Sequence, residues 1–208
     1  MTAGDWRAQA GPARASRDGA PPDKAAEERL LDATEELVRR VGMGKTSMAD
    51  VARSAGVARG TLYRYFESRE VLFDALMLRT AQRFFEDAAS AMDRQPTLAA
   101  QLGEFSERTI RAIHPDAGPM ATQAGMIRML VNESRNALHR TAGFLRPYIV
   151  AARDRGEVRL DLDIDDAGEW LARVLLSFTV FQAGISHEAD DPQSVSKFVQ
   201  RYAISGLA

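Results

Sequence analysis

Residues 46–66 constrain the fold more than any other part of this 208-residue chain, because they combine a helix start, a tight turn and a second helix. Ser47 or Thr46 can cap the first helix, and Asp50 stands at the acidic position of a capping box that begins at Ser47. Gly56 is free to take the left-handed conformation that ends this helix and turns the chain. The segment therefore predicts two short helices joined by a tight turn.

The second of these helices separates packing residues from exposed ones. Leu62 and Phe66 have the spacing of residues that attach a helix to a core. The remaining positions offer hydrogen-bond donors and aromatic rings without a carboxylate: Arg59, Gly60, Thr61, Tyr63, Arg64 and Tyr65. Such groups suit phosphate oxygens and base edges, so this helix is expected to contact nucleic acid.

This pattern resembles, from residue 46 to about residue 76, the helix-turn-helix of the TetR family of bacterial transcriptional regulators. The motifs that carry the resemblance are a small residue leading to Gly-Val in 52–57, Gly-Thr-Leu-Tyr in 60–63, the aromatic pair 65–66, and Ser-Arg-Glu in 68–70. The resemblance implies an all-α protein with an N-terminal three-helix DNA-binding module and a C-terminal helical domain for ligand binding and dimerisation. Outside this region only size and helical layout are similar.

The DNA-contacting positions form one set, which matches the family's pattern: Ser47, Met48, Arg59, Gly60, Thr61, Tyr63, Arg64, Tyr65 and Arg69. Arg59 is the best candidate for a bidentate contact to guanine in the major groove. Thr61 suits a thymine methyl or a phosphate, and the other hydroxyls and Arg69 suit phosphates. Three positions keep alternatives open: Tyr65 and Met48 can serve the core, and Arg64 can contact a base, a phosphate or neither.

The net charge of −2 is unevenly distributed along the chain. Basic residues outnumber acidic ones around the motif, whereas acidic residues gather after residue 160. A basic end and an acidic end are typical of a DNA reader attached to a sensor.

The chain is expected to comprise a disordered arm (1–24), the DNA-binding module (25–70) and an effector-binding and dimerisation domain (71–208). The arm is rich in Ala, Gly, Pro and Arg; it is either a solvated tail or a basic strand that follows DNA. The other expected helices are 25–41, 69–93, 97–113, 119–138, 141–155, 165–187 and 192–204. Pro147 is expected to kink or restart its helix, and 157–162 is the one possible strand.

The resemblance also implies an effector pocket within the larger domain. Its predicted lining is Phe105, Ile110, Met126, Met129, Leu130, Glu133, Phe144, Tyr148, Trp170 and Phe178. Met and aromatic residues suit an adaptable apolar cavity, so the expected effector is a small apolar or amphipathic molecule. The same spacing also fits ordinary core packing.

Dimerisation is expected because one such module makes few base contacts and a specific site normally needs two. The last two expected helices carry the apolar residues Trp170, Leu171, Val174, Leu175, Phe178, Phe181, Val195, Phe198, Val199 and Tyr202. They are predicted to form a four-helix homodimer interface, as in TetR-like proteins. The alternative is that this surface belongs to the chain's own core.

The sequence points away from several other classes. We expect no enzyme activity, no cofactor and no metal site, because no activated nucleophile, ligand cluster or cofactor loop is recognisable. We expect a cytoplasmic protein without contact to a membrane, since there is no apolar run of about 20 residues. The predicted function is a ligand-released repressor that binds a pseudo-palindromic operator. The alternatives are a nonspecific architectural DNA binder and a regulator controlled by a partner protein.

Overall fold

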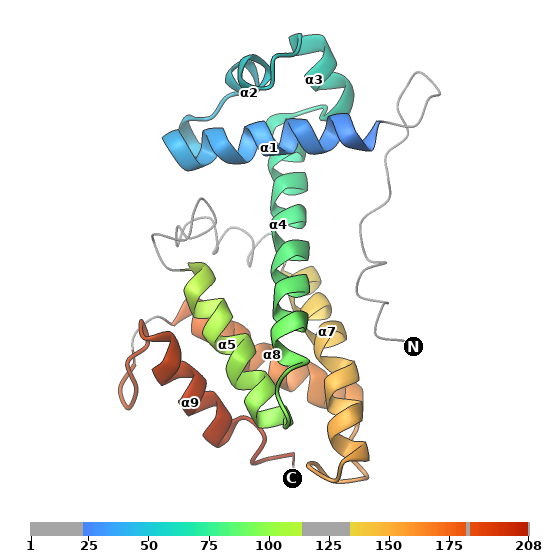
Figure 1. Ribbon diagram of the computed structural model, residues 1–208, viewed down its shortest axis with the longest axis vertical. Helices are drawn as coiled ribbons and strands as arrows, with labels where there is room; N and C mark the ends of the chain where they lie inside the picture. Colours follow the sequence, from blue (N-terminus) through green and yellow to red (C-terminus); the bar gives the residue numbers. More distant parts are fainter. Residues whose placement is uncertain (1–22, 114–133, 182–183, 208) are drawn as a thin grey trace. The chain divides into compact units, whose positions relative to one another are not determined.

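The structure, a computed structural model, describes residues 23–113, 134–181 and 184–207, and within these ranges the regular elements are all helical. In chain order they are α1 (Lys24–Val41), the 3₁₀ turn η2 (Met43–Lys45), α2 (Met48–Ser54), α3 (Arg59–Tyr65), α4 (Arg69–Met92), α5 (Leu98–Ile113), α7 (Ser134–Asp154), α8 (Ile164–Val180) and α9 (Pro192–Tyr202) (Figure 1). The all-α prediction is confirmed. None of these helices is both long and apolar enough to cross a membrane.

The described residues fall into two compact units, one ending at Gln82 and the other beginning at Arg83. The division lies inside α4, because the first turns of this helix pack in one core and its last turns in the other. The predicted boundary between residues 70 and 71 separates DNA binding from effector binding and dimerisation, and it stays a prediction.

The first unit consists of α1, α2, α3 and the beginning of α4 around one apolar core. The buried residues of this core are Leu30, Leu31, Leu37, Val38, Met48, Val51, Ala52, Leu62, Phe66, Leu72, Phe73 and Leu76. Gly56 has a φ of 66°, in the left-handed region, as the predicted turn requires. Ser47 is the N-cap of α2, since its hydroxyl oxygen accepts from the Asp50 N–H at 3.2 Å. The predicted helix-turn-helix is therefore present in its expected place.

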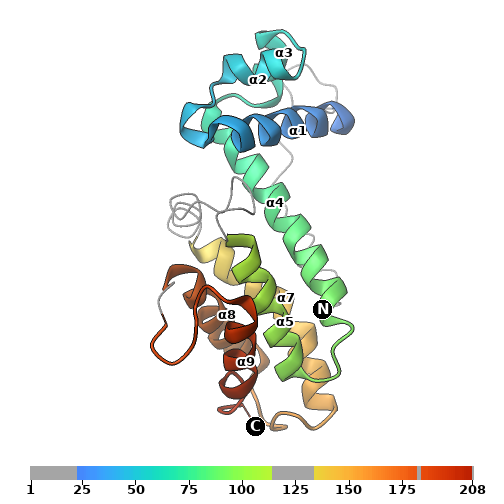
Figure 2. The same cartoon turned by 60° about the vertical axis from the view of Figure 1, so that its left-hand side comes forward.

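The second unit contains α5, α7, α8 and α9, which lie side by side in Figure 2. Helix α9 packs along α5, and α8 packs along α7. Five aromatic rings, those of Phe84, Phe85, Phe105, Phe144 and Tyr148, contact one another between these helices and the end of α4. The core of this unit is thus strongly aromatic.

A carboxylate connects the segment after α7 to the start of α5. Glu157 accepts hydrogen bonds from the Leu98 N–H at 2.6 Å and from Nε of Arg155 at 2.5 Å. Burial raises the pKa of Glu157, but these two partners outweigh it and hold the pKa below its ordinary value of 4.5. The ionised carboxylate therefore helps to cap the N-terminus of α5, where the Thr97 hydroxyl also accepts from the Ala100 N–H at 3.3 Å.

Three details of the second unit differ from the sequence-based expectation. Helix α7 is continuous from Ser134 to Asp154, so neither the expected break after residue 138 nor a restart at Pro147 occurs. The fully buried neighbours Leu145 and Ile149 explain why the helix tolerates the lost N–H of this proline, because packing holds both sides of it. Residues 157–162 form turns rather than a strand. Helix α8 ends at Val180 instead of continuing to residue 187.

Candidate nucleic-acid interface

Helix α3 is attached to the first unit by its apolar side. Leu62 is fully buried and Phe66, the C-cap residue, is 2% exposed. Ala58 is the N-cap, and its carbonyl oxygen accepts from the Thr61 N–H at 2.9 Å. This anchoring leaves the opposite side of α3 as a free surface of the unit.

That free surface carries the predicted DNA-contacting side chains. Arg59, Gly60, Tyr63 and Arg64 are exposed, and Thr61 is partly exposed. Tyr65 is also partly exposed but packs against the apolar core of the unit, which supports the packing alternative for it. The guanidinium of Arg59 lies 6.0 Å from the ring centre of Tyr63, and that of Arg64 lies 5.6 Å from the ring centre of Tyr65. These contacts extend the two arginines along aromatic faces while their N–H donors remain available. The structure thus brings six of the predicted residues together on one helix.

Gly60 is not required by the packing of the unit. Apart from its chain neighbours and the backbone of its own helix, no described atom lies within 4 Å of the position that a Cβ would occupy at this residue, and its φ is not positive. A glycine inside a helix costs about 0.5–1 kcal/mol relative to alanine. Its presence in α3 is therefore not explained by the packing of the unit, and its predicted contact with DNA stays a prediction.

Ser47 and Asp50 form the predicted capping box at the start of α2. Besides accepting from Asp50 N–H, the Ser47 hydroxyl donates to Oδ2 of Asp50 at 2.6 Å. This hydrogen bond, together with the charge of Arg53, holds the pKa of Asp50 below its ordinary value. Ser47 remains exposed, so its cap role leaves the predicted phosphate contact open.

Two other predicted DNA contacts have clear structural roles. Met48 is 7% exposed and belongs to the core, which supports the packing alternative for it. Arg69 donates from Nε to the carbonyl of Thr46 at 2.9 Å and from Nη2 to that of Met43 at 2.5 Å, and its guanidinium stacks 4.5 Å from the ring centre of Phe73. Arg69 therefore holds the segment before α2 in place, and its phosphate contact stays a prediction.

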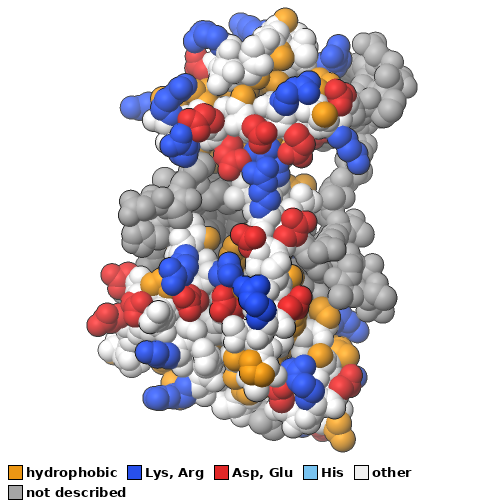
Figure 3. Space-filling view, viewed as in Figure 1, with side chains coloured by type: hydrophobic (Ala, Val, Ile, Leu, Met, Phe, Trp, Pro, Cys, Tyr) orange, Lys and Arg blue, Asp and Glu red, His pale blue; other side chains and the backbone are white. Residues whose placement is uncertain are grey.

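Sequence reasoning missed Arg79 of α4, whose side chain is 7% exposed. Its Nη1 donates to Oε2 of Glu28 at 3.1 Å and to Oδ1 of Asp32 at 2.7 Å, and its Nη2 donates to Oε2 of Glu35 at 2.6 Å. Figure 3 shows acidic and basic side chains gathered where α1 crosses α4. The spacing of the three acids on one face of α1 was a signal that such a partner exists.

The predicted effector-pocket residues are only partly described. Met126, Met129, Leu130 and Glu133 lie outside the described residues. Phe105, Ile110 and Phe144 are buried in the core of the second unit, and Phe178 is partly buried against it. The Tyr148 hydroxyl donates to Oδ1 of Asp93 at 3.1 Å, while Trp170 is 56% exposed. The described members thus form packed core or surface, and their role in ligand binding stays a prediction.

The predicted dimerisation residues separate into two groups. Leu171, Leu175, Val195 and Val199 are buried in the chain's own core. Val174, Phe178 and Phe198 are partly buried, whereas Trp170, Phe181 and Tyr202 are 56%, 73% and 54% exposed. The outer faces of α8 and α9 therefore present large apolar side chains to solvent.

Comparison with known proteins agrees with the helix-turn-helix geometry. Residues 30–76 match the model of the DNA-binding region of "Bacterial regulatory proteins, tetR family". The HTH-type transcriptional regulator AlkX of Mycobacterium tuberculosis is 23% identical over 189 residues, which cover 84% of this chain and 85% of that protein. These similarities are to regulators and not to enzymes.

Solved structures share the fold. The fatty acid degradation regulator FadR from Bacillus halodurans aligns with a TM-score of 0.63 and 19% identity, over 87% of this chain and 95% of that one. FadR from Bacillus subtilis, solved in complex with stearoyl-CoA, aligns with a TM-score of 0.59 and 20% identity, over 87% of this chain and 99% of that one. The helix-turn-helix of this chain, in residues 30–76, is therefore that of the tetR family of bacterial regulatory proteins.

Proposed function

We propose that this protein is a dimeric repressor that binds a pseudo-palindromic operator and is released from it by a small apolar or amphipathic effector. The observation that carries the proposal is the free face of α3, where exposed Arg59, Tyr63 and Arg64 surround a glycine that packing does not require. Arg59 is assigned to a guanine, and the tyrosine hydroxyls are assigned to phosphates.

The homodimer is proposed to form through the outer faces of α8 and α9. Trp170, Phe181 and Tyr202 are large apolar residues that solvent reaches in the single chain. Rings of α8 and α9 also meet, since those of Phe178 and Phe198 lie 6.3 Å apart. Burial of such a surface against a second copy is favourable, and two-fold symmetry would place two copies of α3 on two half-sites.

The effector is proposed to bind in the second unit. Support comes from the aromatic cluster around Phe105 and Phe144, which offers apolar contacts, and from the structural similarity to FadR of Bacillus subtilis, whose structure contains stearoyl-CoA. For this chain the proposal extends only to the class of molecule. An effector that binds two conformations with a differential free energy of about 1–3 kcal/mol would change operator affinity about 5- to 150-fold.

Selection of bound duplexes from a random DNA pool tests the DNA-binding part. We expect a pseudo-palindromic consensus, with base preference relaxed at one position per half-site in Arg59→Ala and uniformly weaker binding in Tyr63→Phe. Binding of DNA without any enrichment would favour the architectural binder instead.

The selected operator then allows a test of the effector. Long-chain acyl compounds and small aromatic alcohols are titrated against the complex, with a polar sugar as the control. Release of DNA by one apolar class supports the proposal. Indifference of operator affinity to every compound that binds the protein would refute it and favour control by a partner protein.

A further inference from the structure

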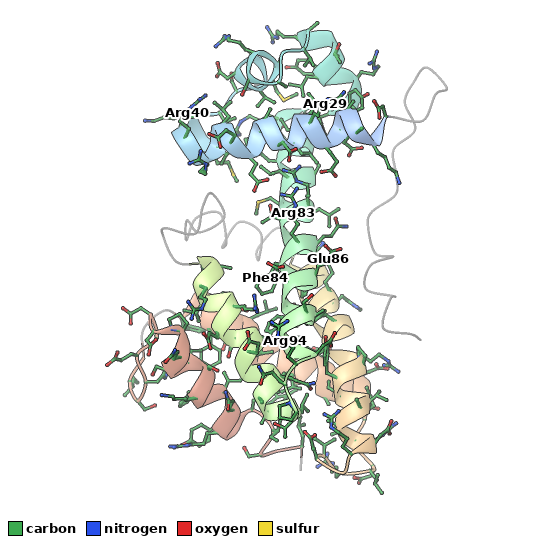
Figure 4. The ribbon with its side chains drawn as sticks, in the orientation of Figure 1. Arg29, Arg40, Arg83, Phe84, Glu86 and Arg94 are labelled. Carbon is green, nitrogen blue, oxygen red and sulfur yellow. The ribbon has the colours of Figure 1, made fainter. Side chains whose placement is uncertain are left out.

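A groove of about 510 Å³ lies beside the helix-turn-helix, within the first unit. It is lined by the last turns of α1, by η2 and by one side of α2, including Leu37, Arg40, Val41, Lys45, Asp50 and Arg53. Figure 4 shows Arg40 at the C-terminal end of α1, with its side chain directed away from the helix. On the face seen in Figure 3, basic side chains gather at this end of the unit.

The charges of this groove are predominantly positive. Its one carboxylate, that of Asp50, is held by the Ser47 hydroxyl and by Nη1 of Arg53 at 3.0 Å. Arg40 and Lys45 are exposed and form no ion pair with any residue that the structure describes. Glu36, on the preceding turn of α1, is bound by Arg39 rather than by Arg40. Two cations without an ion-pair partner among the described residues therefore line the groove, Arg40 from α1 and Lys45 from η2.

The lining distinguishes between possible occupants. The volume falls within the range of about 300–1,000 Å³ that small-molecule sites have, but such sites are lined mainly by apolar side chains. Here three cations surround only two aliphatic residues, Leu37 and Val41. A polyanion with alternating charged and apolar groups matches this lining, and the sugar-phosphate backbone of DNA has that character.

We propose that this groove binds the phosphate backbone of DNA next to the bases that α3 reads, with Arg40 and Lys45 as the contacting residues. The proposal rests on the proposed function. In a helix-turn-helix the first helix crosses the DNA backbone while the second enters the major groove. Helix α2 is that first helix and forms one wall of the groove, so the backbone that passes it continues toward η2 and the end of α1.

The test measures how DNA affinity depends on salt. Full-length wild type, Arg40→Gln, Lys45→Gln and the double variant are titrated on the selected operator and on a random duplex between 0.05 and 0.5 M salt. Arg39→Gln is the matched control, because it removes the same charge one residue away on α1, where the guanidinium is already paired with Glu36. Arg40→Lys keeps the charge and is expected to behave as wild type.

Each phosphate contact contributes about 0.9 to the slope of log affinity against log salt. The proposed dimer carries two copies of each residue, so we expect the slope to fall by about 1.8 in each single variant and by about 3.6 in the double variant. At 0.15 M salt the same relation gives about 30-fold weaker binding in each single variant and about 900-fold in the double variant, equally on the two duplexes. Arg39→Gln is expected to leave slope and affinity unchanged.

The outcomes separate the groove from the proposed function. If wild type binds its operator and the double variant keeps the wild-type slope of log affinity against log salt, the groove proposal is refuted. The proposed repressor function is not affected by that result. A loss confined to the operator, or an equal loss in Arg39→Gln, also overturns it. If wild type binds no duplex at all, the proposed function is refuted, and the groove proposal that depends on it is refuted as well.

Discussion

The buried guanidinium of Arg79 allows a prediction about stability that depends on which partner is removed. Three carboxylates of α1 accept its hydrogen bonds, and their side chains are 57%, 62% and 37% exposed, against 7% for Arg79. If the arginine is removed, the carboxylates regain water. If the carboxylates are removed, the guanidinium loses its counter-charges and keeps the hydrogen bond from Nη1 to the Glu28 carbonyl at 3.3 Å. The two perturbations should therefore differ in cost.

Magnitudes follow from this asymmetry. Arg79→Met loses charge-assisted hydrogen bonds, each worth about 1.5–3 kcal/mol, but it also ends the burial of a cation and leaves acids that hydrate readily. We expect the free energy of unfolding to fall by about 1–3 kcal/mol. Replacing Glu28, Asp32 and Glu35 together by Ala leaves a buried unpaired charge, for which about 3–5 kcal/mol is expected.

Urea unfolding of the full chain, followed by far-ultraviolet circular dichroism, measures both changes as shifts of the midpoint at constant slope. The sharpest comparison is the quadruple variant, in which Arg79→Met is added to the triple alanine variant. It should be more stable than the triple variant, because the unpaired charge is gone. Arg39→Met, which removes an exposed pair with Glu36, is the control and should leave the midpoint unchanged. A triple variant that is no less stable than Arg79→Met, or a quadruple variant without recovery, would refute the reasoning.

Three further predictions concern single residues. Gly60→Ala should raise the free energy of unfolding by about 0.5–1 kcal/mol, as measured by urea unfolding. The same variant should still bind the operator more weakly in a DNA titration. Unchanged DNA affinity would contradict the proposed close approach of DNA to Gly60. Glu157→Gln should be less stable than wild type at pH 7, because the lowered pKa of Glu157 means that its ionised form stabilises the fold. The difference in stability should shrink as pH falls below 4.5 and the carboxylate becomes protonated. A difference in thermal midpoints that stays constant across pH would argue against this role. Phe181→Asp should shift the protein from dimer to monomer in sedimentation. Leu160→Asp should not, because Leu160 is 82% exposed, against 73% for Phe181, but lies outside α8 and α9. Loss of the dimer in both variants or in neither would exclude the proposed interface.

Local signals made the DNA-binding unit predictable. Ser47 caps α2, Gly56 turns the chain and Leu62 attaches α3, and each of these roles depends on neighbours within a few residues. The roles of Arg69 and Arg79 depend instead on partners 23 to 51 residues away along the chain. No periodicity within a helix reveals whether an arginine meets a phosphate or the carbonyl groups of another segment.

The second unit was less predictable because packing overrides local breakers there. Pro147 was expected to kink or restart its helix, but no restart occurs, because the buried residues on either side keep α7 continuous. Apolar spacing was equally ambiguous for the effector pocket. Phe105 and Phe144 have the pattern of a cavity lining and of a core, and their ring centres lie 5.7 Å apart within packed core. Sequence spacing predicts that a side chain is buried. It does not reveal whether that side chain packs against the protein's own residues or lines a cavity that a ligand can fill.

In the proposed function an effector acts through helix α4, in which Leu72 and Leu76 belong to one core and Phe85 and Met92 to the other. A typical allosteric coupling is about 1–3 kcal/mol. Separating Arg79 from α1 would leave a buried unpaired charge and cost about 3–5 kcal/mol, which exceeds that coupling. An effector with a coupling free energy in this range would therefore leave the ion pairs of Arg79 with α1 intact. Helix α1 would then move together with the first turns of α4 as one rigid body. Control of DNA binding would then act on the placement of α3 and not on the internal stability of the DNA-binding unit.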